Sequence, residues 1–197
     1  MKIVVAVFCV LALTPAMSRP QAAGPNRVMA PDVPQEIEVP DGHVPFLVAH
    51  AVGTQGYFCL SSGTSSVWVP FGPQATLFDE ELGQVMTHFL SPNPDQGWAL
   101  RATWQDSRDT SAIWAGLAIP SSDANYVAPG AIPWLRLTVG GEEPGPNGGE
   151  RLTAATYIHR VNTIGGIAPT TPCNEADRRA LVPYQADYYF YRPSGRQ

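Results

Sequence analysis

The stretch RLTAATYIHRVNTIGGIAPTTPC, from Arg151 to Cys173, indicates the fold class of this chain. Its first part, Arg151 to Thr163, alternates apolar and polar residues, a period that is typical of a half-buried β-strand. Gly165-Gly166 then interrupts the pattern, because glycine tolerates backbone angles that end regular strand pairing. We therefore expect one long strand, a break at the two glycines, and a proline-containing loop that ends at Cys173.

Residues 1–18 have the order of a secretory signal peptide. Lys2 supplies a positive charge, Ile3 to Leu13 is apolar, and Ala16-Met17-Ser18 offers the small residues of a cleavage site. The apolar run is shorter than the roughly 20 residues of a membrane-spanning helix. We expect a secreted protein, free in the extracellular space or associated with a cell wall, with an extended leader at 19–34 and a single β domain at 35–197.

Three cysteines occur in the chain, and Cys9 would leave with the signal peptide. Cys59 and Cys173 then form an even pair in an oxidising compartment. We predict a disulfide between them.

Short apolar or alternating segments fill the rest of the chain, separated by turns that draw on 18 Gly and 20 Pro. This pattern predicts an all-β fold, an antiparallel β-sandwich or barrel of about ten short strands with long Pro/Gly loops. Within it, Ile37 and Val39 should lie on a short strand, and Ser91 to Gly97 should form an exposed loop. Asn174 to Leu181 is the one short helix that we expect, near the carboxyl end.

The charge balance restricts the partners. The formal net charge is −5, and Lys2 is the only lysine. Nucleic acids and anionic membrane surfaces both require clustered positive charge, so we expect neither as a partner. Without a lysine beyond the signal, Schiff-base and P-loop chemistry are excluded, and we expect no cofactor and no membrane span. The sequence leaves the oligomeric state open.

Polar residues beside aromatic ones, within segments that otherwise supply the core, are the candidate ligand-binding residues. They are Gln55, His88, Trp104, Arg108, Arg160 and Asn162. One interpretation is a pocket for a small molecule or an extracellular polymer, with Trp68, Trp98 and Trp104 as stacking platforms. The alternative is an internal network in which Asp79, Asp109 or Asp187 holds Arg108 or Arg160, because buried polar groups need partners.

Enzymatic alternatives rest on fewer residues. A hydrolase would use His88 with Asp109 or Ser107, although the chain lacks the Gly-x-Ser-x-Gly motif. A glycoside hydrolase would draw its carboxylate pair from Asp79, Glu80, Glu81, Asp106 and Asp109. The four histidines, His43, His50, His88 and His159, show no metal-ligand spacing, so we predict no metal site.

Several runs together carry a family resemblance. They are Val52 to Cys59, Gly72 to Asp79, Thr87 to Leu90, Thr103 to Gln105, Ser107 to Ala112, Ala128 to Leu135, Arg160 to Thr163, Gly165-Gly166, Val182 to Tyr184 and Ala186 to Tyr191. In this order the chain resembles the secreted fungal and bacterial family called domain of unknown function 3455, from about residue 40 to 192.

That resemblance implies a secreted protein without an established activity. Some fungal members carry a malate dehydrogenase label, but this chain has no strand–GxGxxG–helix unit that would bind a dinucleotide. We therefore expect a non-enzymatic extracellular or cell-surface domain that binds a ligand or partner.

Overall fold

The structure is a computed structural model that describes residues 28–173 and 178–195. The expected signal peptide and residues 19–27 of the expected leader lie outside this range. Val28 to Pro34, the rest of the expected leader, is described, and Val33 packs against a cluster of buried side chains on the outside of the domain.

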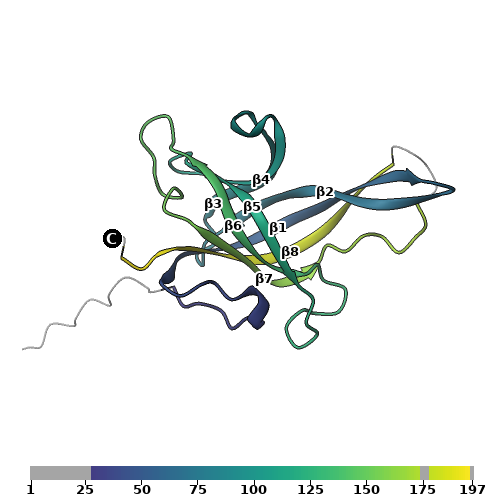
Figure 1. Ribbon diagram of the computed structural model, residues 1–197, viewed down its shortest axis with the longest axis horizontal. Coiled ribbons are helices and arrows are strands. Elements are labelled where there is room, and N and C mark those ends of the chain that lie inside the picture. The colour runs from purple at the N-terminus through teal and green to yellow at the C-terminus, as the bar shows by residue number, and fades with distance from the viewer. Residues whose placement is uncertain (1–27, 174–177, 196–197) are drawn as a thin grey trace, which may run out of the picture.

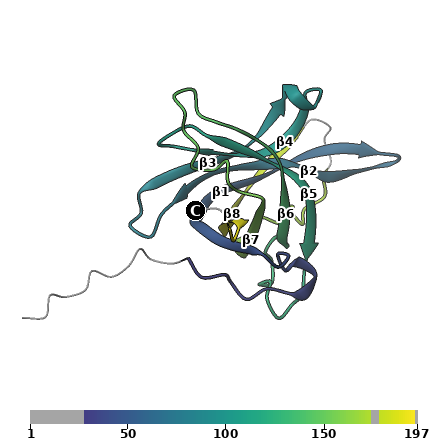
Figure 2. The ribbon, with the colours of Figure 1, turned by 60° about the vertical axis from the view of Figure 1, so that its left-hand side comes forward.

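Eight antiparallel strands form a closed barrel in which each strand pairs with the next and β8 pairs back to β1 (Figures 1 and 2). They are β1 (His43–Ser62), β2 (Ser65–Phe78), β3 (Gln84–Asn93), β4 (Ala99–Asp106), β5 (Ala112–Ser121), β6 (Trp134–Glu143), β7 (Tyr157–Gly165) and β8 (Arg179–Pro193). The predicted all-β class is confirmed, with a barrel rather than a sandwich. The number of strands is eight, not about ten.

The difference in number has two sources. No strand forms at Ile37 and Val39, and β1 and β2 are single strands of 20 and 14 residues that continue through glycines. Gly53 lies inside β1, where an added Cβ would stand 2.1 Å from the carbonyl oxygen of Gln74. Glycine therefore marks a close approach of two strands here rather than a turn. Gly56 and Gly72 lie opposite each other farther along the same pair.

Two local predictions are wrong for identifiable reasons. The segment Gln35–Ile37 is a 3-10 turn instead of a strand, between the prolines at 34 and 40, and Ile37 is nevertheless fully buried. The expected helix falls partly on residues 174–177, outside the described residues. From Arg179 the chain is already in β8, paired with Phe58 of β1.

The stretch from Arg151 to Cys173 forms a shorter strand than expected. Arg151 to Ala154 forms turns, and β7 begins only at Tyr157. The break at the two glycines is confirmed, since Gly165 and Gly166 have φ of 67° and 82°. The predicted loop at residues 91–97 is half strand, because β3 continues to Asn93 before the 3-10 turn Pro94–Gln96.

The barrel interior holds the main core. Trp104, Tyr188, Phe190, Met86 and Ile158 are its large, nearly fully buried side chains. A second cluster lies on the outer surface, where Ile37, Trp134 and Val161 pack together under the amino-terminal segment. The domain therefore has a filled barrel and an outer cover.

A long hairpin projects beyond the barrel (Figure 1). We call it the arm: Tyr57–Ser62 of β1, Ser65–Phe71 of β2 and Arg179–Leu181 of β8, which pair side by side. The predicted disulfide is confirmed within the arm, where Cys59 is bonded to Cys173 with a Cα–Cα distance of 5.7 Å.

Candidate binding site

His88 and Trp104, two predicted ligand-binding residues, meet inside the barrel. Their rings stack with centroids 4.0 Å apart, and both side chains are almost completely buried. The Nδ1 atom of His88 bonds the carbonyl oxygen of Thr103 at 2.8 Å. Burial lowers the pKa of His88 to about 3, so the ring is neutral at physiological pH.

Arg160 also faces the barrel interior, next to Tyr188 on the neighbouring strand. Its Nη2 donates to the carbonyl oxygen of Pro133 at 2.8 Å, and this bond holds the segment before β6. Among the described residues no carboxylate lies within ion-pair distance of Arg160, so the interpretation that an aspartate holds it is wrong. Gln55 is buried as well, and its Nε2 donates to the carbonyl oxygen of Gly56 at 3.5 Å.

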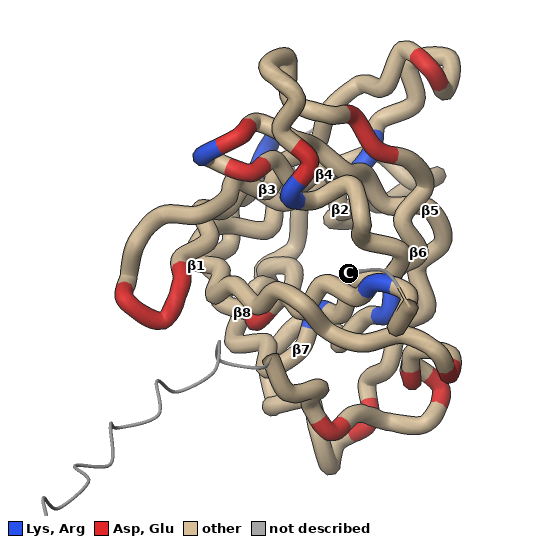
Figure 3. The backbone as a smooth tube through the Cα atoms, turned by 90° about the vertical axis from the view of Figure 1, so that its left-hand side faces the viewer, with Lys and Arg blue, Asp and Glu red and all other residues tan. Residues whose placement is uncertain are grey.

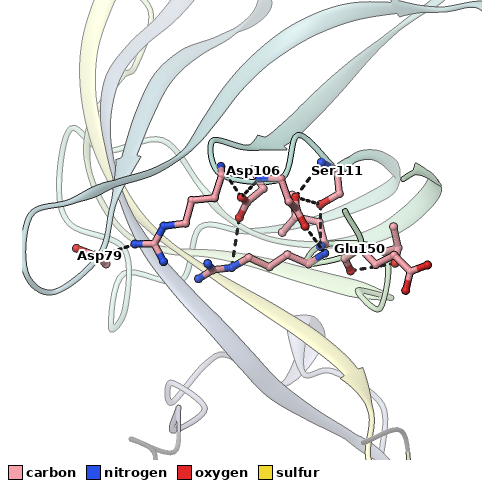
Figure 4. Close-up of polar contacts among 9 residues, drawn as sticks. Asp79, Asp106, Ser111 and Glu150 are labelled. Carbon is pink, nitrogen blue, oxygen red and sulfur yellow. Dashed lines mark hydrogen bonds and ion pairs between the residues drawn. The ribbon is translucent and has the colours of Figure 1, made fainter. Parts of the chain in front are cut away.

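Arg108 belongs to a different group of residues, the turn between β4 and β5 (Figure 4). Its Nη2 lies 3.6 Å from Asp79 Oδ2, which confirms the predicted internal network for this arginine. The Oδ1 atom of Asp106 accepts from the backbone nitrogens of Arg108 and Asp109, and its Oδ2 pairs with Arg151 Nε at 3.3 Å. This network connects the turn to Arg151, which precedes β7 in the sequence.

Asp109 completes the same network. It accepts from the backbone nitrogen and hydroxyl of Ser111 at 2.9 and 2.7 Å, and from the backbone nitrogen of Arg151 at 2.8 Å. Burial alone would raise the pKa of Asp109, but these hydrogen bonds and the charge of Arg151 outweigh burial and lower it.

The residues proposed for a hydrolase do not bond to one another. Ser107 Oγ accepts from Gln84 Nε2, and Asp109 accepts from Ser111 within the turn. His88 bonds the carbonyl oxygen of Thr103 inside the barrel. The three tryptophans are equally dispersed. Trp104 is in the core, Trp98 is 71% exposed after β3, and Trp68 is in the arm, where it donates to the carbonyl oxygen of Thr171.

Asn162 turns out of the barrel. It has a φ of 51°, and the pairing of β7 with β8 shifts between Val161 and Ile164. Its side chain therefore reaches the outer surface, where Nδ2 donates to Asp187 Oδ2 at 2.7 Å.

Asn162 belongs to a cluster of side chains that no sequence pattern indicated. His50 Nδ1 bonds Asp187 Oδ1 at 2.7 Å, and its Nε2 lies 3.2 Å from Glu80 Oε1. Burial would lower the pKa of His50, but the hydrogen bonds and charges of Asp187 and Glu80 outweigh burial and raise it. The strand register places His50 beside Asp187, and the turn after β2 brings Glu80 to them. No sequence spacing signals this arrangement.

Next to this cluster, uncharged side chains form two rows across the outside of five strands. We call them the outer ladder. The first row is Ile164, Gln185, Val52, Thr76 and Thr87, and the second is Pro183, Thr54, Gln74 and Phe89. Adjacent strands lie about 4.8 Å apart, so the first row spans roughly 19 Å.

Open depressions lie on both sides of Val52 in the outer ladder. One is floored by Gly53 and Ala75, and the other borders Gly165 and Tyr184. The side-chain hydrogen bonds of threonine and glutamine among the described residues involve other positions and none of the ladder's threonines or glutamines. They are available to a ligand.

The ladder belongs to a region that lacks charge. No Asp, Glu, Lys or Arg occurs from Ala51 to Phe78. The described acidic residues instead lie mainly in loops, several of them at the barrel end that Figure 3 turns toward the viewer. No helix in the described residues is long and apolar enough to cross a membrane. In that part of the chain no three His, Cys, Asp or Glu side chains are placed so that they could hold a metal ion together.

No curated protein and no solved structure shows significant similarity to this chain. A family model described as "Protein of unknown function (DUF3455)" matches residues 40–192. The resemblance drawn from the sequence is thereby confirmed, and the chain belongs to this family.

Proposed function

We propose that this protein is a non-enzymatic binding domain that holds an extended, uncharged, hydroxyl-rich polymer, such as a neutral polysaccharide, along the outer ladder. The observation that carries the proposal is the set of unbonded Thr and Gln side chains, which lie among apolar ones in two rows of uncharged residues.

The chemistry of the two surfaces is complementary. A neutral sugar chain presents hydroxyl groups and apolar C–H faces in alternation. Gln74, Thr76 and Thr87 supply donors and acceptors, while Val52 and Phe89 supply apolar contact beside them. An uncharged site also avoids the desolvation of ions, which is costly when no opposite charge compensates for it.

Retention on insoluble neutral glucans and chitin tests the proposal. Each hydrogen bond removed by Gln74→Ala or Thr76→Val should weaken binding about fivefold, since a net hydrogen bond contributes roughly 1 kcal/mol. Thr64→Val, at the exposed hairpin tip, is the matched control and should bind normally. Equal binding by all the variants, or no retention on any neutral polymer, would refute the proposal.

We also propose that the protein is exported. The Cys59–Cys173 bond supports this compartment, because disulfides persist in oxidising surroundings. Amino-terminal sequencing of protein recovered from the medium of expressing cells should show that residues 1–18 have been removed.

A further inference from the structure

Arg160 brings a permanent positive charge to the aromatic interior of the barrel. Burial is the largest influence on the pKa values of His88, Tyr184 and Tyr188, and the charge of Arg160 lowers all three. The guanidinium therefore lies near these rings. A charged group in a protein interior normally has a partner of opposite charge, but no carboxylate of the described chain lies within ion-pair distance of Arg160.

The same interior contains hydrogen-bond donors without acceptors. Arg160 Nε and Trp104 Nε1 are buried, and neither bonds an acceptor among the described residues. The hydroxyls of Tyr184 and Tyr188 lie 3.3 Å apart, so a bond between them uses the hydrogen of one hydroxyl and leaves that of the other free. A positive charge and unused donors together require a ligand that is negative and accepts hydrogen bonds.

The barrel is open to solvent at the end where Arg160 lies. Alternate residues of β4 from Trp104 to Leu100 face the interior, yet Trp104 is 1% exposed and Leu100 is 60% exposed. At this end β4 leaves β5, because the two strands pair only at Thr103–Gln105 of β4. Arg160 is on the same side, since its register neighbour on β6 leads to Pro120, far beyond the part of β5 that pairs with β4. Its side chain is only half-buried, so it is accessible from this end.

We propose that this end of the barrel binds a small organic carboxylate with an apolar body, which pairs with Arg160 and lies against Trp104 and Tyr188. The carbonyl oxygen of Pro133 occupies one N–H group of the guanidinium, and enough others remain for the two parallel bonds of an arginine–carboxylate pair.

The surroundings of Arg160 favour a carboxylate over other anions. One cation compensates one negative charge, whereas a doubly charged phosphate would keep an unpaired charge beside apolar side chains. The aromatic rings of Trp104 and Tyr188, with centroids 5.6 Å apart, offer contact to an apolar body that an inorganic anion lacks. This site faces the interior and is separate from the outer ladder, which lies on the outside of the strands.

Titration of the purified protein with benzoate, followed by calorimetry and NMR, tests the proposal. We expect saturable binding that shifts the signals of Arg160 Nε–H and of the Trp104 indole N–H, and no binding of benzamide, which has the same ring without the charge. Arg160→Gln should raise the dissociation constant for benzoate at least about thirtyfold, as the loss of one partner of a desolvated charge pair does. Arg108→Gln is the matched control, because it removes the same charge from an exposed side chain at the other end of β4.

Circular dichroism and the unfolding midpoint establish that each variant is folded. Arg160→Lys keeps the charge without the planar pair of donors and should also bind benzoate less tightly than the wild type. If Arg160→Gln does not fold, Arg160→Lys and the NMR signals of the wild type decide the question.

Thr76→Val, in the outer ladder, should bind benzoate normally, so that a failure of polymer binding and a failure of carboxylate binding are distinguishable. The proposal is overturned by the absence of saturable benzoate binding, by benzoate binding that leaves the Arg160 and Trp104 signals unmoved, or by equal affinity in Arg160→Gln. Tighter binding of inorganic phosphate than of benzoate would also overturn it.

Discussion

At the scale of single residues, the polar side chains of this barrel serve different purposes according to the face on which they lie. His88 and Arg160 point into the barrel and bond backbone carbonyls there. His50 and Asn162 point outward and share the carboxylate of Asp187. The outward cluster borders the outer ladder and contains a histidine with a raised pKa.

His50 should make stability depend on pH. Its pKa in the folded protein exceeds the ordinary value of 6.5, so protonation favours folding. The contribution is complete below about pH 6.5 and is lost as the pH rises through the folded pKa. Because the side chain is 37% exposed, we expect less than about 1 kcal/mol. Urea unfolding of His50→Gln should show a loss of stability at pH 5.5 that shrinks at pH 8.5.

His43→Gln is the control for that experiment. His43 Nδ1 bonds only the carbonyl oxygen of Pro40, without a carboxylate partner in the described chain. A pH-independent difference between His50→Gln and the wild type would contradict the assignment of the raised pKa to Asp187 and Glu80.

Asp106 should matter more for stability than any other carboxylate of the turn. Its side chain is buried and accepts two backbone N–H bonds, and it pairs with Arg151. Asp106→Ala should lower the free energy of unfolding by about 2–4 kcal/mol, because two donors and a cation lose their acceptor. Chemical denaturation measures this, with the exposed Asp95→Ala as a control expected to change stability by less than about 0.5 kcal/mol.

The sequence identified some of these residues as site candidates, but it did not show which of them lie together in the fold. His88 and Trp104 were both candidates because they lie in strand segments that supply the core, but their stacking on each other became visible only in the structure. Regular alternation along a strand would place Asn162 on the same face as Arg160, two residues away. The left-handed backbone of Asn162 and the register shift in β7 place it on the other side. A single irregular residue reverses the side chain's direction, and alternation alone does not reveal where that occurs.

At the scale of elements, the arm is the part of the sheet that needs stabilising contacts from another segment of the chain. Three strands projecting from a barrel lose the neighbours that stabilise the rest of the sheet. The disulfide closes a sequence separation of 114 residues and fixes the loop that covers one arm face. The cysteine pair was predictable from counting, and so was the hairpin of the arm, because Ser61 to Thr64 is a turn between two strand-like segments. The continuation of both strands into the barrel was not predictable, because Gly53 and Gly72 suggested strand ends.

Replacing the two cysteines tests whether the disulfide stabilises the arm. The Cys59→Ser/Cys173→Ser variant should lose about 4–5 kcal/mol of stability on the loop-entropy estimate. Hydrogen exchange should quicken first in the arm, at residues 57–70, while the barrel strands β3 and β4 remain protected. Reduction of the wild type should reproduce the effect, and uniform loss of protection over all strands would contradict a local role.

At the scale of the whole molecule, β7 separates two apolar layers. Ile158 and Arg160 face the barrel interior, while His159 and Val161 lie under the amino-terminal segment. His159 Nε2 bonds the carbonyl oxygen of Ile37 at 2.7 Å, and its Nδ1 bonds the hydroxyl of Tyr191 at 3.0 Å. Burial lowers the pKa of His159 to about 4. The amino-terminal segment therefore keeps this ring dry and neutral.

Removing the cover should change both stability and titration. Ile37→Ala should cost about 2–5 kcal/mol, as for other large-to-small substitutions of fully buried residues, since Ile37 is 0% exposed. Where the loosened segment admits water to His159, the pKa of that ring should rise from about 4 toward its ordinary value of 6.5. Proton NMR titration of the histidine rings measures this shift, and Gln35→Ala, an exposed change in the same turn, should leave it at about 4. If Ile37→Ala destabilises the protein while the His159 pKa stays near 4, water is excluded by the strands and Tyr191, and the amino-terminal segment contributes packing alone.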